Sequence, residues 1–222
     1  MKLLATAIFD ERSCLDNCFS ESKIIDTAEE LYTDDFGAIV IWGGEDISPS
    51  LYNQSLSTYT HASVSLSLRD QIEVNLANAA MNKKIPIIGI CRGAQLMCAL
   101  SGGSIIQHVN RHMGNHLMET NKGMRLVTNS VHHQMMNPFK IEHELIAWAY
   151  PKISTMFVGE KDKLVLDAYS SNFREPEIVW FPETKSLGVQ GHPELTQSGL
   201  LHEYLNKLVN EKTLGLIPFI FK

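Results

Sequence analysis

The stretch IPIIGICRGAQLMCALSGGSI, residues 85–105, passes directly from an apolar run into a helical pattern. The run IIGI, residues 87–90, is short and wholly apolar, which is typical of a strand buried inside a sheet. The residues AQLMCAL, 94–100, predict a helix, and the Ser-Gly-Gly sequence after them predicts its end. Cys91 stands at the junction, where its thiol is either a core group or a nucleophile.

Cys91 lies between Gly89 and Gly93 in the form glycine-x-nucleophile-x-glycine. This form makes a sharp turn that holds a nucleophile above the end of a strand and at the start of a helix. Glycine suits both flanks because side chains there would collide with the neighbouring strand and helix. The helix N-terminus also favours a thiolate. Buried free cysteines are common, however, and Cys98 fits that description, so this segment alone does not decide the role of Cys91.

Short β-rich runs alternate with amphipathic helical stretches along the chain, which predicts an α/β fold. Helices are expected from residue 68 to about residue 84 and around residues 201–209. Strands are expected at residues 2–9, 37–42, 87–90, 124–129, 144–150, 163–169, 177–181 and 187–192, with PETKS joining the last two as a hairpin. Residues 107–122, rich in His, Asn and Met, are expected to form a loop.

These elements predict one domain over residues 1–222. We expect a three-layer sandwich in which a central, mainly parallel sheet has helices on both faces, together with a small antiparallel hairpin region. Trp148 and Trp180 fall in strand-like runs and are expected in the core.

Charge and hydropathy exclude two kinds of partner. The net charge is -6 at pH 7 and Lys and Arg do not cluster, which argues against a nucleic-acid partner. No apolar run approaches the roughly 20 residues that a membrane span needs, so we expect no membrane partner. A small neutral or anionic ligand is compatible with this composition.

The cysteines bear on the compartment. The apolar N-terminal stretch LLATAIF runs straight into charged residues without a small-residue cleavage site, so we interpret it as a strand rather than a secretory signal. Four cysteines without such a signal predict reduced thiols in the cytoplasm. Cys14 and Cys18 have a spacing that a metal or redox pair could use, but two incidental thiols are the preferred interpretation.

A second element supports the nucleophile interpretation of Cys91. The residues GVQGHPE, 188–194, predict a strand that ends in His192 and Glu194. A histidine at a strand end can act as general base toward a cysteine, and a carboxylate two residues later can fix its tautomer. Pro193 restricts the backbone between them and holds the two side chains in a defined relation.

Together, GICRGAQ and GVQGHPE resemble the class I glutamine amidotransferase superfamily, whose members cleave the γ-amide of glutamine or a related γ-glutamyl bond with a Cys-His-Glu triad. The residues WGGEDISPSLY, 42–52, are similar to the glycine loop of its γ-glutamyl hydrolase branch. Residues 69–93 resemble that branch's helix–strand–elbow segment, and NSVHHQ, 129–134, resembles its substrate loop. Arg92 and the glycine loop are most similar to the γ-glutamyl-γ-aminobutyrate hydrolase group.

The resemblance implies a role for each matched residue. Cys91 would be the nucleophile, His192 the base and later the acid, and Glu194 the group that orients the imidazole. Backbone N–H groups of Gly44 and Arg92 would form the oxyanion hole. The resemblance places the glutamyl moiety of the substrate, glutamine or a γ-glutamyl amide, against Gly43, Gln95, Ser130, Val131 and His132.

The chain departs from the family pattern at one position, and two alternative functions are compatible with the motifs. The family usually has an aromatic residue, often Trp, immediately before the catalytic His, whereas this chain has Gly191. A glutaminase subunit that passes ammonia to a separate synthetase or ligase chain would use the same motifs. A catalytically silent binding relative is the other alternative, and a homodimer stays open.

The sequence predicts neither a cofactor nor a metal site. His112 and His116 in HMGNH have the i, i+4 spacing that can share a cation on a helix, but the segment lacks the glutamate of HExxH and contains a glycine. We expect His116 and His132 to line the active-site cleft, and His112 and His133 to be surface or packing residues. Three acidic residues in the matched segments are expected to have structural rather than catalytic roles. Asp46 would hold the loop after Gly44 in place, and Asp70 and Glu73 would be charges in the first turn of a helix.

Overall fold

The computed structural model describes residues 3–7, 22–195 and 199–215. Its largest sheet has nine strands in the order β2-β1-β3-β4-β13-β12-β10-β7-β8. Their bounds are β1 Leu3–Ala7, β2 Ser22–Ile25, β3 Phe36–Ile41, β4 Ile87–Ile90, β7 Met113–Thr120, β8 Arg125–Val131, β10 Glu144–Ala149, β12 Pro176–Phe181 and β13 Ser186–Val189. Cys14 and Cys18 lie outside the described residues, so the interpretation of that pair stays a prediction.

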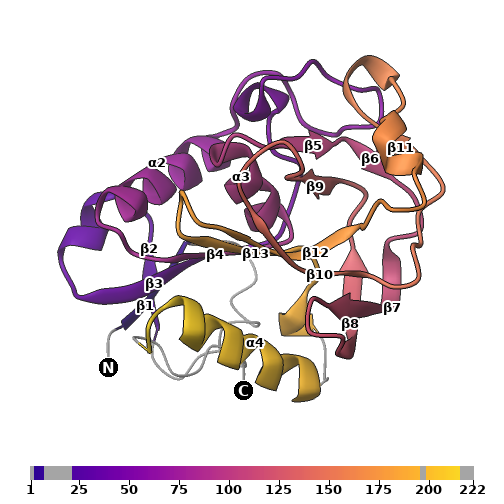
Figure 1. Cartoon of the computed structure of the whole chain (residues 1–222). Helices are drawn as coiled ribbons and strands as arrows, with labels where there is room; N and C mark the ends of the chain where they lie inside the picture. The colour runs from indigo at the N-terminus through magenta and orange to yellow at the C-terminus, as the bar shows by residue number, and fades with distance from the viewer. Residues whose placement is uncertain (1–2, 8–21, 196–198, 216–222) are drawn as a thin grey trace.

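The sheet is covered on both faces, which confirms the predicted α/β three-layer fold. Helices α2 (Leu68–Asn82) and α3 (Arg92–Leu100) lie above it, and α4 (Gly199–Lys212) lies below it (Figure 1). Two small sheets pair β5 (Ser104–Ile106) with β9 (Met135–Asn137), and β6 (His108–Val109) with β11 (Phe157–Val158). The predicted helices and most predicted strands are therefore confirmed.

The apolar run of β4 is explained by burial on both faces. Ile87 belongs to the core between the sheet and the helices α2 and α3, whereas Ile88 and Ile90 belong to the core between the sheet and α4. Both neighbours of β4, namely β3 and β13, run parallel to it. A central strand with two apolar faces ends where Cys91 begins, which places this residue at the carboxyl edge of the parallel half of the sheet.

The antiparallel part of the sheet is larger than predicted. Strands β12 and β13 form the expected hairpin, and β10, β7 and β8 extend it by three further antiparallel pairings. The prediction of a loop at residues 107–122 was wrong, because that segment contains β6 and β7. Only the second half of β7 is partly buried, so its first residues, Met113 to Asn115, are exposed and give no alternation of apolar and polar positions.

Two further expectations are corrected or qualified. The strand predicted at residues 163–169 is mainly a 3-10 helix, Leu166–Tyr169, and Leu164 forms only a single bridge with Val158. The apolar residues Leu164 and Leu166 that suggested a strand are exposed. Trp148 is buried as expected, whereas Trp180 is only partly buried.

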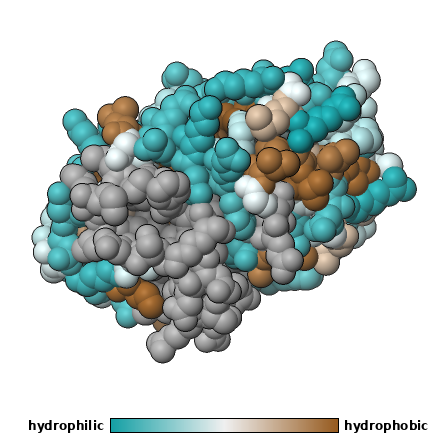
Figure 2. Space-filling view, turned by 90° about the horizontal axis from the view of Figure 1, so that it is seen from below, coloured by the Kyte–Doolittle hydropathy of each residue, from teal (hydrophilic) through white to brown (hydrophobic). Residues whose placement is uncertain are grey.

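None of the helices in the described part of the chain is long and apolar enough to cross a membrane. Among the described residues seen on the face below the sheet, most are hydrophilic, and apolar side chains gather on one part of it (Figure 2).

Candidate active site

Cys91 occupies a strained turn between β4 and α3. Its backbone has φ 50° and ψ -103°, a left-handed conformation that a non-glycine residue rarely adopts. The turn is fixed because the Cys91 N–H donates to the carbonyl of Val189 over 2.7 Å, and the Cys91 carbonyl accepts from the N–H of Gln95 over 3.1 Å. The predicted elbow is therefore present, with the thiol at the N-terminus of α3.

The two flanking glycines are required by close backbone approaches. A Cβ on Gly89 would overlap the carbonyl group of Gly93, and a Cβ on Gly93 would overlap the carbonyl oxygen of Ile41 in β3. These are the helix and strand contacts that the sequence pattern predicts. Larger residues at either position would separate α3 from the sheet.

His192 lies beside Cys91 and is bonded to Glu194. A Cβ on Gly43 would lie 2.6 Å from Cε1 of His192 and 3.4 Å from Cβ of Cys91, so these three residues surround one point. Nδ1 of His192 is 2.6 Å from Oε1 of the buried Glu194. Burial of the ring opposes its protonation, but the hydrogen bonds with Cys91 and Glu194 outweigh burial and raise the pKa of His192 to about 10. The imidazolium is therefore favoured at neutral pH.

The glycine loop after β3 is held by Arg69. Nη2 of Arg69 donates to the carbonyl of Gly43 over 2.7 Å and to that of Trp42 over 3.2 Å. A Cβ on Gly44 would overlap the guanidinium, and Gly44 has φ 147°. Glycine is therefore needed at position 44 both for its conformation and for the approach of Arg69.

The side chain of Arg92 points away from the thiol into a buried network of charges. Its guanidinium pairs with Oδ1 of Asp70 over 2.5 Å and with Glu73, while Nε of Arg69 pairs with the same Glu73 over 2.8 Å. Asp70 also completes a capping box with Ser67, which confirms its expected first-turn position. The sequence interpretation missed the pairing of Asp70 and Glu73 with Arg92, and Glu73 lies beyond the first turn in which it was expected.

The predicted substrate residues fall into two groups. Gln95 is buried and donates from Nε2 to the carbonyl of Gln134 over 3.1 Å, so it joins α3 to the segment after β8. Ser130 and His132 are also buried, and their polar side-chain atoms contact His112 and Gln134. Val131 is exposed at 46%.

His132 carries a neutral ring. Its burial, reinforced electrostatically by the neighbouring His112 ring, holds the pKa of His132 well below its usual value. Nδ1 lies 2.8 Å from the carbonyl of Gln134 and therefore carries the proton, which leaves a lone pair on Nε2. His192 also acts on His132 electrostatically, which agrees with the expectation that His132 lies beside the cleft.

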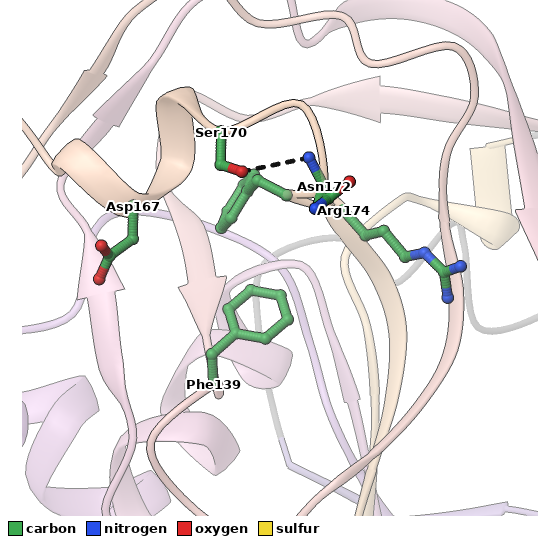
Figure 3. A pocket seen from close by; sticks show the side chains of 6 residues that line it. Phe139, Asp167, Ser170, Asn172 and Arg174 are labelled. Atoms are coloured by element: carbon green, nitrogen blue, oxygen red, sulfur yellow. Dashed lines mark hydrogen bonds between the residues drawn. The ribbon is translucent and has the colours of Figure 1, made fainter.

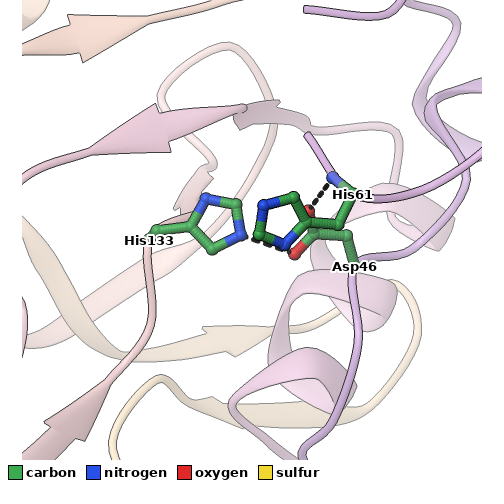
Figure 4. A group of neighbouring side chains, drawn as sticks. All are labelled: Asp46, His61 and His133. Atoms are coloured by element: carbon green, nitrogen blue, oxygen red, sulfur yellow. Dashed lines mark hydrogen bonds and ion pairs between the residues drawn. The ribbon is translucent and has the colours of Figure 1, made fainter. Parts of the chain in front are cut away.

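Asp46 holds the loop after Gly44 in place, as expected, and it also contacts a residue outside that loop. Its carboxylate accepts from the N–H of His61 over 2.8 Å, from the hydroxyl of Thr60 over 3.1 Å, and pairs with Nε2 of His133 over 3.0 Å (Figure 4). Burial favours the neutral acid, but these hydrogen bonds lower the pKa of Asp46. Asp46 thus connects the glycine loop to the segment that follows β8.

Two surface pockets lie away from these residues. One, of about 380 Å³, is lined by Phe139, Asp167, Ser170, Asn172, Phe173 and Arg174 (Figure 3). The other, of about 580 Å³, lies between α2 and residues 26–32. Neither pocket is lined by Cys91, His192 or Glu194. The candidate active site is therefore defined by the chemistry of these three side chains and not by the volume of a pocket.

Gly191, the departure from the family pattern, has a structural explanation. A Cβ on this residue would overlap the hydroxyl of Thr128 and lie 2.6 Å from the carbonyl oxygen of Asn129, both in β8. The same carbonyl accepts the N–H of His192 over 3.1 Å. The backbone of β8 thus occupies the place next to His192 that an aromatic side chain would need.

We expect Gly191→Ala to lower the free energy of unfolding by about 1–3 kcal/mol, because the methyl group forces β8 outward. Urea unfolding of both proteins measures the effect. Gly199→Ala is the matched control, because a Cβ there has no atom within 4 Å. An equal effect of the two substitutions would contradict the close packing of Gly191.

Comparisons with known proteins agree with this fold. Residues 25–137 match the Peptidase C26 family. A Schizosaccharomyces pombe protein named "Putative glutamine amidotransferase" is 30% identical over 70% of this chain, and the match spans 61% of that protein. The gamma-glutamyl-gamma-aminobutyrate hydrolase of Escherichia coli O157:H7 is 28% identical over 59% of this chain and 54% of its own length. The chain therefore spans less than two thirds of the curated relatives it matches.

A solved structure extends the fold comparison to almost the whole chain. The structure of PurLQS from Thermotoga maritima has a TM-score of 0.59 at 14% identity and covers 96% of this chain and 98% of that one. The fold and the matching segment are those of class I glutamine amidotransferase-like proteins. The chain belongs to the Peptidase C26 family, a family of hydrolases and amidotransferases.

Proposed function

We propose that this protein is a cysteine hydrolase that cleaves a γ-glutamyl amide bond through a glutamyl-thioester intermediate. The observation that carries the proposal is the position of Cys91, which lies on its strained turn beside His192, while His192 is hydrogen-bonded to Glu194. A thiol at a helix N-terminus next to an imidazolium is activated as a thiolate.

The reaction follows from these groups. The Cys91 thiolate attacks the γ-carbonyl carbon, a C–S bond forms, and the carbonyl oxygen takes the negative charge. When the C–N bond breaks, Nε2 of His192 gives its proton to the departing amine. Water then attacks the thioester carbon as His192 removes its proton, the C–S bond breaks, and glutamate leaves as the Cys91 thiolate is restored beside the imidazolium. Glu194 holds the imidazole in one orientation through both steps.

Two backbone N–H groups are suited to the oxyanion. In a trans peptide the C=O and N–H point in opposite directions, and the carbonyl of Gly43 is bound by Arg69. The N–H of Gly44 therefore points away from Arg69. The N–H of Arg92 belongs to the first turn of α3, where backbone N–H groups have no intrahelical partner and can bind an oxyanion. Their convergence on one oxygen is part of the proposal.

The glutamyl moiety is proposed to bind between the glycine loop and the segment after β8. Gly43 leaves space beside Cys91, and Gln95 lines the start of α3. Because the side chains of Ser130 and His132 and the N–H of His132 are already hydrogen-bonded to His112 and Gln134, we assign the α-amino and α-carboxylate contacts to the remaining backbone groups of Ser130, Val131 and His132.

A glutaminase subunit that supplies ammonia to a separate synthetase is the second candidate. A Buchnera aphidicola carbamoyl phosphate synthase small chain is 29% identical over 59% of this chain, although the match spans only 31% of that protein. The apolar side chains on the face below the sheet do not single out a partner, so a synthetase contact and a homodimer remain predictions (Figure 2). A cytoplasmic setting, also a prediction, is supported by the free thiols of Cys91 and Cys98.

A substrate screen separates these functions. The protein is incubated with glutamine and a panel of γ-glutamyl amines, and the products are detected by mass spectrometry. We expect release of amine from γ-glutamyl amines by the protein alone. Activity confined to glutamine, and only with an added synthetase, would favour the second candidate.

Labelling with a thiol-directed glutamine analogue identifies the nucleophile in the same samples. We expect modification of Cys91 at pH 8 and none of Cys98, because burial raises the pKa of the Cys98 thiol to about 12 and leaves about one thiolate in 10⁴. If the analogue fails to label Cys91, the result would favour a catalytically silent binding protein over a hydrolase.

A further inference from the structure

A second group of reactive side chains lies where the antiparallel part of the sheet opens. β10 separates β12 from β7 along the sheet, but it ends at Ala149. Near that end, side chains of β12 and of the β7 region meet, where Glu177 contacts His116 and lies close to His112. The group comprises three imidazoles and two carboxylates: His112, His116, His132, Glu175 and Glu177.

These side chains are packed together in the interior. His112, His132, Glu175 and Glu177 are each at most 4% exposed. The rings of His112 and His132 stack with centroids 4.6 Å apart. Nε2 of His116 is 2.9 Å from Oε1 of Glu177, whereas His112 lies 3.7 Å from each carboxylate, which is too long for a hydrogen bond.

Three polar atoms of this group are buried without a hydrogen-bond partner. They are Nε2 of His112, Nε2 of His132 and Oε2 of Glu177. Each such atom in a native protein costs about 1–3 kcal/mol and calls for an explanation, such as an ion or water. By contrast, Glu175 accepts two backbone N–H groups, of Ile153 and Ser154, over 2.7 Å each.

We propose that His112, His132 and Glu177 bind a divalent transition-metal ion, for which Zn²⁺ is the best match. Each of the three residues offers a ligand atom, and these atoms lie within 4.8 Å of one another. Donors around tetrahedral Zn²⁺ lie about 3.4 Å apart, so side-chain rotations of small amplitude bring them together. Two imidazoles and one carboxylate are donors that Zn²⁺ accepts readily.

A cation explains the group better than a water molecule does. Nε2 of His132 and Oε2 of Glu177 both present lone pairs, since Nδ1 of His132 bears the proton and Oε1 of Glu177 is paired with His116. A metal ion accepts all the lone pairs at once. It also offsets the negative charge of two carboxylates removed from water, which a neutral water molecule does not.

The ion would act as a cross-link close to the candidate active site. His112 precedes β7, His132 follows β8, and Glu177 belongs to β12, so one ion joins three segments. The backbone of β8 also accepts the N–H of His192 at Asn129. The metal would hold β8 in place beneath His192, and we assign it a structural role.

A surface group of three possible ligands provides the internal control. Asp46, His61 and His133 also bring ligand atoms within 4.8 Å of one another (Figure 4). There, however, the carboxylate of Asp46 is fully occupied by hydrogen bonds from the loop and His133. The surface group therefore needs no ion to account for its geometry.

Metal content tests the proposal without reference to activity. The full chain is stripped with a chelator, titrated with Zn²⁺ or Co²⁺, and analysed by mass spectrometry for bound metal and by absorption for tetrahedral Co²⁺. We expect one ion per chain and a higher Tm on binding. Failure of the wild-type chain to bind either ion at micromolar concentration would overturn the proposal.

Variants locate the ion. His132→Asn and Glu177→Gln are expected to weaken binding at least ~100-fold, whereas His133→Asn is expected to leave it unchanged. Circular dichroism establishes whether each variant is folded. If one variant is not folded, the Co²⁺ absorption spectrum of the wild-type chain tests whether the ion has tetrahedral ligands. Retention of the ion in both interior variants, or its loss in His133→Asn alone, would place it elsewhere and contradict the assignment.

Discussion

Replacing Cys91 by alanine is expected to lower kcat for γ-glutamyl amide hydrolysis by at least ~10⁴-fold, because no other group can form the thioester. Alanine removes only the sulfur, and the turn is held by backbone bonds to Val189 and Gln95. We therefore expect the Tm to change by no more than a few degrees. Single-turnover release of amine, followed by mass spectrometry, measures the loss.

Cys98→Ala is the matched control for this substitution. Cys98 is fully buried on the same helix, and its thiol donates a weak hydrogen bond to the carbonyl of Ser104 over 3.5 Å. We expect this variant to keep its kcat and to lose a little stability from the small cavity. Full activity of Cys91→Ala, or equal losses in the two variants, would rule out Cys91 as the nucleophile.

The local signals in the sequence predicted the centre of the molecule correctly. The apolar run 87–90 required burial on both faces, and the glycines beside Cys91 required close approaches, because each constraint acts over a few residues. His192 and Glu194 were found for the same reason, since two positions at a strand end fix their mutual geometry. Their pairing with Cys91 was inferred from the chemistry of a histidine at a strand end, and the resemblance of both motifs to one superfamily supported it.

The parts that the sequence did not predict depend on contacts between distant segments. The first residues of β7 pair with β8 but face solvent, so they show no pattern of burial. His112, His132 and Glu177 come from three segments up to 65 residues apart, and no spacing rule brings them together. The role of Gly191 was hidden likewise, because the backbone that excludes a side chain there belongs to β8.

The buried network around Arg92 gives the second large effect, this time on stability. We expect Arg92→Met to lower the free energy of unfolding by about 3–5 kcal/mol, because Asp70 loses its cationic partner in the interior and only Arg69 remains to offset the charge of Glu73. Methionine preserves much of the side-chain volume, and the backbone N–H proposed for the oxyanion hole is unchanged. Urea unfolding at pH 7 measures the difference.

Arg125→Met is the matched control, with the same change of residue at the surface. Arg125 is 54% exposed, lies 3.3 Å from Glu119 and stacks over the ring of Tyr150, so we expect a loss of about 1 kcal/mol or less. Equal losses in the two variants at pH 7 would mean that the interior charges are solvated, and that the network does not hold the start of α3 against α2.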